Sequence, residues 1–522
     1  MIAAFVALAA AGCVGILTRN SPEYLAEQPG ATHPADQMFQ AATDLFYARH
    51  FDDARRAFLK LLEQYPRTRH TPAAQFKIAE CLFFLDDFRN AAVYFQRYMD
   101  AYPQGPDYYD ARARLAQCKE KGVTDTPALL AGNRPSDRLI AVMIPVLAGR
   151  NLVEVSVEMD RLARMGVNTV ILRAFHNAGQ PFHGLVTSPT TTAGVYFRTS
   201  HAPVVYDLLD DVAKICHRNG LRIFAWMNTR EAVWGLPDRP ELRTWRYDFA
   251  KGDIVPGEGL NLFHPQTEAR LVGLFRDLAT NDIDGVILQD DLLLRYDEDF
   301  SFEARQAYHR LTRHDLLPVR LYRKDAHRQA EAGGLGGFTE EYWEFARMKR
   351  DRLVEIQARL GEVVKEIRPT ARFGVSFLYT AVNNPAQGLA FFAQDLTKSG
   401  EEGFDYYAVT AYQTQIARDL SLTEDQVYDV MENVAGRARA IIGSPEQVVI
   451  KLQVVDWERG RLLALSQIEK ALARVAAGGV PGIALFPYRP DFPFDAIRAA
   501  LARFESEATG SPPTEGTNGK ER

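Results

Sequence analysis

The sequence predicts an α/β fold: a (β/α)8 TIM-like barrel preceded by an all-α domain of helical repeats. From Arg138 onward, short β-branched runs alternate with amphipathic helical stretches, as in βα units around a parallel sheet. Before that point, a unit repeats every 37 residues. Turn-forming residues between the two regions predict a linker at 126–137. With 522 residues, the chain is long enough for a barrel and a smaller domain.

The composition is that of an ordinary globular protein and excludes some classes of partner. A formal net charge of −6 gives no electrostatic basis for binding a polyanion, so we do not expect a nucleic acid partner. The four cysteines include no CxxC motif, and neither a zinc site nor a disulfide framework is indicated. His176 and His264 lack a third ligand at suitable spacing. We therefore expect no metal and no cofactor.

The N-terminus predicts export and lipidation. Residues 2–12 form an apolar run that ends in Ala-Ala-Gly before Cys13, which resembles the end of a bacterial lipoprotein signal peptide. The run is too short to span a bilayer. Cys13 would then carry the lipid that anchors the protein to the envelope. The protein would face the periplasm, most simply at the outer membrane. Residues 1–34 would be the signal peptide and the tether. Because no Lys or Arg precedes the run and Ala10 stands where Leu is usual, an uncleaved N-terminus stays open.

Residues 35–125 are predicted to form tetratricopeptide-like repeats. A small residue, an aromatic four positions later and a proline after the second helix recur at the same offset, in the pairs Ala54/Ala91, Phe58/Phe95 and Pro66/Pro103. A further helix at 108–119 is expected to cap the stack. Two interpretations stay open: a concave surface for a protein partner, or a spacer that holds the next domain away from the membrane.

The barrel is predicted at 138–505, followed by a disordered tail at 506–522. A doubly wound open sheet is the alternative, but no GxGxxG or GxxxxGK[ST] loop follows any strand. The eight expected strands are 139–147, 169–175, 222–227, 285–289, 372–378, 406–411, 448–452 and 482–486.

Polar and aromatic residues at the strand ends, where barrel enzymes carry their chemistry, predict a carbohydrate site. The fourth strand ends in the doublet Asp290-Asp291. Because successive side chains of a strand point to opposite faces, at most one of the two is expected to face a substrate, and the other interpretation is a helix cap or a pair with Arg230 or Arg295. The candidate substrate-binding residues at the other ends are Arg173, His176, Trp226, Asn228, Tyr412, Gln453, Trp457 and Tyr488.

The chain resembles a known family at this point: the C-terminal glycosidase-like domain of periplasmic lipoproteins that deacetylate and export poly-β-1,6-N-acetylglucosamine (PgaB type). The resemblance covers most of residues 138–495. It rests on the motifs at 166–170, 224–227, 285–291, 384–385, 391–394, 452–457 and 486–492. It implies hydrolysis of partly deacetylated poly-N-acetylglucosamine, with an acid of the Asp290-Asp291 motif central to cleavage.

The sequence departs from the family pattern in three respects. Gln289 stands where the family commonly has His. Lys451 stands where an acidic residue is frequent, so this position either lacks a second carboxylate or binds an anionic sugar. The helical repeats replace the deacetylase domain, and deacetylase activity is therefore expected to be absent.

Glycoside cleavage generally uses two carboxylates. The hypothesis from the sequence is that Asp290 or Asp291 is the general acid. Its partner would come from another strand end, first Asp456 or Asp491, then Glu231 or Asp297, unless an N-acetyl group of the substrate supplies the nucleophile. Two alternatives remain: a non-catalytic module that binds polysaccharide while the repeats dock a secretion partner, and a barrel acting on another glycan.

Overall fold

The computed structural model describes residues 33–123, 138–236 and 239–509. The chain divides into two compact units, residues 1–134 and 135–522. The predicted lipidation site at Cys13, nearly all of the tether, all but the first residues of the tail, and the linker at 126–137 lie outside the described residues. Among those described, no helix combines the length and apolar character needed to cross a bilayer.

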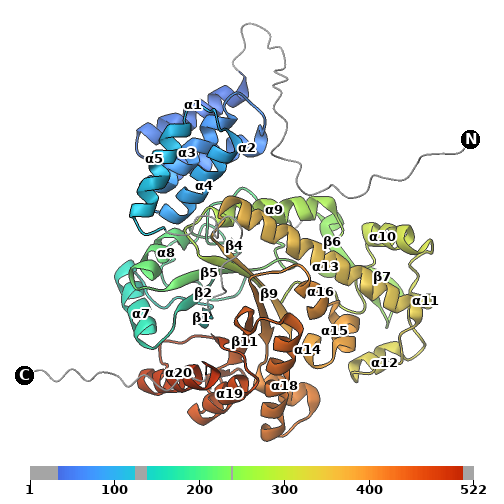
Figure 1. Ribbon diagram of the computed structural model, residues 1–522. Coiled ribbons are helices and arrows are strands. Elements are labelled where there is room, and N and C mark those ends of the chain that lie inside the picture. Colours follow the sequence, from blue (N-terminus) through green and yellow to red (C-terminus); the bar gives the residue numbers. More distant parts are fainter. Residues whose placement is uncertain (1–32, 124–137, 237–238, 510–522) are drawn as a thin grey trace, which may run out of the picture. The chain divides into compact units, whose positions relative to one another are not determined.

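The first unit is a stack of antiparallel helices, as the repeats predicted (Figure 1). The small and aromatic residues of the repeat, among them Ala54, Phe58, Ala91 and Phe95, are fully buried where neighbouring helices pack. The predicted capping helix is present as α5. The helices are α1 (Pro34–Tyr47), α2 (Phe51–Gln64), α3 (Thr71–Phe84), α4 (Phe88–Ala101) and α5 (Tyr108–Glu120).

The second unit contains a closed barrel of eight parallel strands, which confirms the predicted fold. All eight expected strands are found, because each is an apolar run buried on both faces, as parallel strands covered by helices require. In order around the barrel they are β1 (Ile140–Ile144), β14 (Gly482–Phe486), β11 (Val448–Gln453), β10 (Tyr406–Thr410), β9 (Arg372–Leu378), β8 (Gly285–Leu288), β5 (Arg222–Met227) and β2 (Thr169–Arg173).

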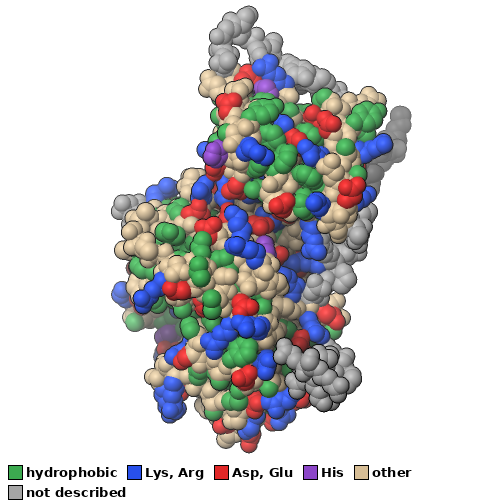
Figure 2. All heavy atoms as spheres, turned by 90° about the vertical axis from the view of Figure 1, so that its left-hand side faces the viewer, with side chains coloured by type: hydrophobic (Ala, Val, Ile, Leu, Met, Phe, Trp, Pro, Cys, Tyr) green, Lys and Arg blue, Asp and Glu red, His purple; other side chains and the backbone are tan. Residues whose placement is uncertain are grey.

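Helices follow the strands and surround the barrel (Figure 1). The last helix continues to Thr509, beyond the predicted end of the barrel, and buries Phe504. On the face shown in Figure 2, basic and acidic side chains are interspersed. The principal helices are α7 (Leu152–Arg164), α8 (Leu209–Arg218), α9 (Pro265–Ala279), α13 (Glu340–Ile367), α18 (Glu424–Ile442), α19 (Leu465–Ala477) and α20 (Phe494–Thr509).

Insertions enlarge the loops after several strands, above all after β5 and β8. A hairpin of β6 (Arg243–Asp248) and β7 (Asp253–Leu260) follows β5. Short helices between β8 and α13 build a second apolar core around Tyr342. The remaining elements are α10 (Phe302–Thr312), α11 (Pro318–Leu321), α12 (Ala326–Glu331), α14 (Thr380–Asn383), α15 (Pro385–Phe392), α16 (Leu396–Gly400), α17 (Gln413–Leu420), the strand pairs β3 (Phe175–His176) with β4 (Gly194–Val195) and β12 (Val455–Asp456) with β13 (Arg461–Leu462), and the 3₁₀ turns η1 (Pro240–Leu242) and η2 (Pro445–Gln447).

An ion-pair cluster lies at the end of the barrel opposite the carboxyl ends of the strands. Nε2 of His217 lies 2.9 Å from a carboxylate oxygen of Asp284, and Nδ1 lies 3.3 Å from Asp282. The same Asp284 oxygen accepts the backbone N–H of Ile223 on β5. Burial opposes the charged imidazole, but hydrogen bonds and charges of the two carboxylates outweigh it and raise the pKa of His217 to about 10.

This cluster predicts a loss of stability at alkaline pH. Because the folded-state pKa of His217 is raised above its ordinary value of 6.5, its contribution is fully present below about pH 6.5 and is lost as the pH rises through about 10. His217→Gln should therefore flatten the fall of the thermal unfolding midpoint across this range. Equal slopes for the variant and the unmodified protein, measured by circular dichroism, would contradict the prediction.

Candidate active site

Asp290 projects into the mouth of the barrel, meaning the space between the carboxyl ends of the eight strands. Its Oδ2 accepts a hydrogen bond from the Thr410 hydroxyl at 3.2 Å and lies 3.5 Å from Nζ of Lys451. Thr410 ends β10 and Lys451 belongs to β11, whereas Asp290 follows β8, so both contacts cross the mouth. The Asp290 side chain is 24% exposed and the Lys451 side chain 2%. A ligand at the mouth can therefore reach the carboxylate.

Asp291 is held away from the mouth. Its carboxylate accepts the backbone N–H and the hydroxyl of Thr229, both at 2.8 Å, and the backbone N–H of Glu231 at 2.9 Å. Burial raises the pKa of Asp291 to about 7, although these N–H donors oppose the rise. Asp291 thus fastens the loop after β5 to the end of β8.

Aromatic rings line one side of the mouth. The rings of Trp226 and Phe486 lie 5.6 Å apart, Phe486 and Tyr412 lie 5.7 Å apart, and Tyr412 meets Trp457 at 5.1 Å. Burial raises the pKa of the Tyr412 hydroxyl well above its usual range, and the Asp290 charge adds to the rise. Trp457 is 45% exposed. Such rings can stack on the apolar face of a sugar.

Several buried polar atoms at the carboxyl ends of β5 and β8 have no partner within the described chain. They are Oδ1 and Nδ2 of the fully buried Asn228, Nε1 of Trp226 and Oε1 of Gln289. Asn228 and Gln289 directly follow the paired strands β5 and β8. Buried polar groups generally make hydrogen bonds, and the part of the chain that the structure describes offers these four atoms none.

Two predicted substrate-binding residues serve the loop after β2 instead. The guanidinium of Arg173 donates to the side-chain oxygen of Gln180 and to the carbonyl of Pro181, both at 2.8 Å. His176 is buried and lies 2.9 Å from the hydroxyl of Tyr196. Burial, assisted by the Arg173 charge, lowers the pKa of His176 to about 4. Neither side chain has a contact with Asp290.

Two further predicted residues are likewise engaged elsewhere. The amide of Gln453 accepts from the hydroxyl of Thr414 and donates to the carbonyl of Val455. Burial raises the pKa of Tyr488 above its usual range and the charge of Glu158, on α7, adds to the rise. The structure therefore brings Lys451 into contact with Asp290, gathers Trp226, Tyr412 and Trp457 with Phe486 on one side of the mouth, and places Asn228 directly after β5. The other four candidates are engaged elsewhere.

The two carboxylates predicted first as partners are paired within their own loops. Asp456 accepts the backbone N–H groups of Glu458 and Arg459 and lies 3.1 Å from the Arg459 guanidinium. Asp491 forms a two-pronged pair with Arg489 at 2.9 Å. These contacts lower the pKa of Asp491, and the Arg459 contacts outweigh burial to lower that of Asp456. Neither carboxylate is brought to Asp290.

Sequence reasoning missed Thr410 and Phe486 as site residues. Both end a barrel strand and face inward, as their contacts across the mouth demonstrate. The alternation of side chains along β10 could have identified Thr410. Tyr406 contacts Phe224 across the barrel, and Thr410 lies four residues further along the strand, on the same face.

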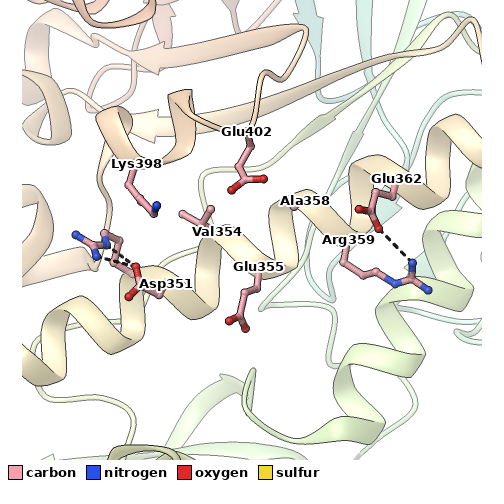
Figure 3. A pocket seen from close by; sticks show the side chains of 9 residues that line it. Asp351, Val354, Glu355, Ala358, Arg359, Glu362, Lys398 and Glu402 are labelled. Atoms are coloured by element: carbon pink, nitrogen blue, oxygen red, sulfur yellow. Dashed lines mark hydrogen bonds and ion pairs between the residues drawn. The ribbon is translucent and has the colours of Figure 1, made fainter. Parts of the chain in front are cut away.

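A surface pocket of about 590 Å³ lies away from the strand ends (Figure 3). It is lined by residues of α13 and of the segment 398–402. Several of its charges pair with one another, as Arg350 does with Asp351 and Arg359 with Glu362. Because no aromatic ring lines it, the pocket does not fit a sugar site as the mouth does.

The fold and the mouth together define the class of a (β/α)8-barrel glycoside hydrolase. Residues 148–486, more than half of the chain, match the hypothetical glycosyl hydrolase family 13 (GHL13). The chain belongs to this family. Residues 31–112 match YfiO, described as an outer membrane lipoprotein. No curated protein sequence matches the chain.

Comparison with a solved structure supports the fold. The PgaB (BpsB) glycoside hydrolase domain from Bordetella bronchiseptica is similar with a TM-score of 0.53 and 18% identity, over 70% of this chain and 99% of that domain. A β-galactosidase from the psychrophilic Marinomonas ef1 has a TM-score of 0.47 and 12% identity, over 72% of this chain and 60% of that one. At these identities the likeness concerns the fold alone.

The contacts of Asp291 predict that this residue stabilises the fold, which a substitution can test. In Asp291→Asn, an amide N–H₂ would replace one of the two oxygens that accept hydrogen bonds. We expect a loss of about 1–3 kcal/mol in the free energy of unfolding, measured in urea. Asp491→Asn, which removes an exposed ion pair, should cost less than about 1 kcal/mol. Equal losses in the two variants would contradict this role.

Proposed function

We propose that the barrel hydrolyses glycosidic bonds of an amino-sugar exopolysaccharide, such as partly deacetylated poly-β-1,6-N-acetylglucosamine, with Asp290 as the essential carboxylate. The observation that carries the proposal is the position of Asp290: a partly exposed carboxylate at the mouth of a glycosyl hydrolase barrel, beside aromatic rings. Cleavage within the chain, as in an endo-acting enzyme, fits a mouth whose exposed Trp457 extends the aromatic side.

The substrate class is supported by two kinds of observation. The sequence motifs around Asp290 resemble those of poly-N-acetylglucosamine-processing domains, and the fold is similar to the PgaB (BpsB) glycoside hydrolase domain.

The contacts of Asp290 favour a different role from the general acid expected from the sequence. Both partners of the Asp290 carboxylate are donors, the Thr410 hydroxyl and the Lys451 ammonium, so Asp290 acts as an acceptor in this site. This arrangement suits the base or nucleophile of the reaction, and the leaving oxygen then needs another proton donor.

The cellular setting that we propose is the bacterial envelope, with a lipid on Cys13 anchoring the protein on the periplasmic side, at the outer membrane. The match of the repeats to a family of outer membrane lipoproteins supports this placement. The repeats would hold a protein partner of the export machinery or act as a spacer.

Replacement of Asp290 tests the proposed activity. Asp290→Asn should lower kcat on partly deacetylated poly-N-acetylglucosamine by about 10²- to 10⁴-fold, because the variant lacks the carboxylate that assists the reaction. Binding of a short oligosaccharide, followed by calorimetry, should persist. Undiminished cleavage by the variant would contradict the assignment, and tight binding without any product from the unmodified protein would favour the polysaccharide-binding module.

Removal of the exposed ring tests the stacking surface. Trp457→Ala should raise KM by up to about tenfold, the equivalent of about 0.5–1.5 kcal/mol for a lost aromatic contact. Trp457→Phe should restore part of this loss because it keeps an aromatic face. If steady-state kinetics give one KM for all three proteins, Trp457 does not bind the glycan.

A further inference from the structure

The proton donor that the proposed reaction needs can be sought among the carboxylates near Asp290. Asp291 is buried and accepts three hydrogen bonds. Glu298 is buried in an ion pair with Arg230 at 2.6 Å. Asp299 is fully buried and accepts the N–H of Ser301. None of these three carboxylates is accessible to a glycan.

The carboxylates nearer the surface are mostly committed as well. Asp297 lies 3.7 Å from the guanidinium of Arg246 and is 15% exposed. Asp456 and Asp491 are paired with arginines of their own loops. Glu231 is different, because it is exposed and its carboxylate has no ion pair or hydrogen bond among the described residues.

The backbone of Glu231 is held beside the catalytic strand end. Its N–H donates to Asp291, the residue that follows Asp290. The preceding Arg230 is anchored in the ion pair with Glu298, which lies in the loop after β8. β5 and β8 are neighbouring parallel strands, with Met227 opposite Leu288. The loop after β5 is therefore fastened on both sides of Asp290-Asp291.

The 2.9 Å hydrogen bond from its N–H to the Asp291 carboxylate fixes the backbone of Glu231 beside the Asp290-Asp291 turn. The side chain of Glu231 is exposed and is not committed to another group among the described residues. A proton donor needs this combination, because the group must reach the leaving oxygen and then exchange its proton with water.

We propose that Glu231 is the general acid of the reaction, an assignment that rests on the proposed function. Glu231 transfers its carboxyl proton to the glycosidic oxygen while the bond from that oxygen to C1 breaks, and the bonding electron pair leaves with the oxygen. A water oxygen bonds to C1 and gives its proton to the Asp290 carboxylate. The two products together gain one water, and Asp290 returns a proton to solvent while Glu231 takes one up. Asp291 is a positioning residue, since it acts through the Glu231 backbone.

Two substrates separate an acid from a structural residue. Glu231→Gln should cleave the natural glycan about 10²- to 10⁴-fold more slowly. On a nitrophenyl glycoside of the same oligosaccharide, whose leaving group departs without a proton, the loss should be less than about tenfold. The alkaline limb of the kcat/KM profile on the glycan should disappear in the variant. Equal losses on both substrates, or an unchanged pH profile, would overturn the assignment.

Glu258→Gln is the matched control, since Glu258 is an exposed glutamate of the neighbouring hairpin. It should cleave both substrates at the unmodified rate, and a loss equal to that of Glu231→Gln would overturn the assignment. The outcomes also separate the two proposals. If the unmodified protein cleaves the glycan and Asp290→Asn does not, but Glu231→Gln remains fully active, the acid assignment fails and the proposed function stands. If the unmodified protein cleaves neither substrate, both fail.

Discussion

The hydrogen bonds that Thr229 and Glu231 donate to the Asp291 carboxylate are the constraint on which the site depends. They join the ends of two neighbouring barrel strands, and they use an acceptor that is itself buried. A buried carboxylate without such donors would be strongly destabilising. With them, the chain turns at this point so that Asp290 faces the mouth. One acid of the doublet thus organises the backbone, and the other is partly exposed at the mouth.

The ion pair across the mouth is the second defining feature. Lys451 is almost completely buried, and a buried ammonium needs a counter-charge, which Asp290 supplies. The resemblance to the PgaB-type domains had implied that Lys451 replaces a frequent acidic residue. In the structure the Lys451 ammonium lies 3.5 Å from the Asp290 carboxylate. Under the proposed mechanism, a second carboxylate would then come from a different strand end.

Much of the fold was predictable because its signals are local. Each barrel strand is a short apolar run buried on both faces, and the repeats preserve Ala54 and Ala91 at helix crossings. The assignment of roles within the doublet was not predictable, because strict alternation stops where β8 ends at Leu288. The pairing of Asp290 with Lys451 joins residues far apart in the sequence, and no local pattern encodes it.

The carboxylates first expected as partners of Asp290 could not be ranked correctly from the sequence either. Asp456 and Asp491 stand at strand ends, as catalytic carboxylates do, but each has an arginine within three residues. Those arginines engage the carboxylates locally. Glu231 has no such neighbour with which it pairs, although Arg230 precedes it, because that guanidinium is taken by Glu298. An arginine close in sequence therefore makes a strand-end carboxylate a weaker catalytic candidate.

The most direct test of the proposed mechanism is a crystal structure of the Asp290→Asn variant with a bound oligosaccharide. We predict sugar rings against Tyr412 and Trp457, with the glycosidic bond between residue 290 and the Glu231 carboxylate. A glycan bound away from the mouth, or a glycosidic bond flanked by Asp456 or Asp491, would contradict this mechanism.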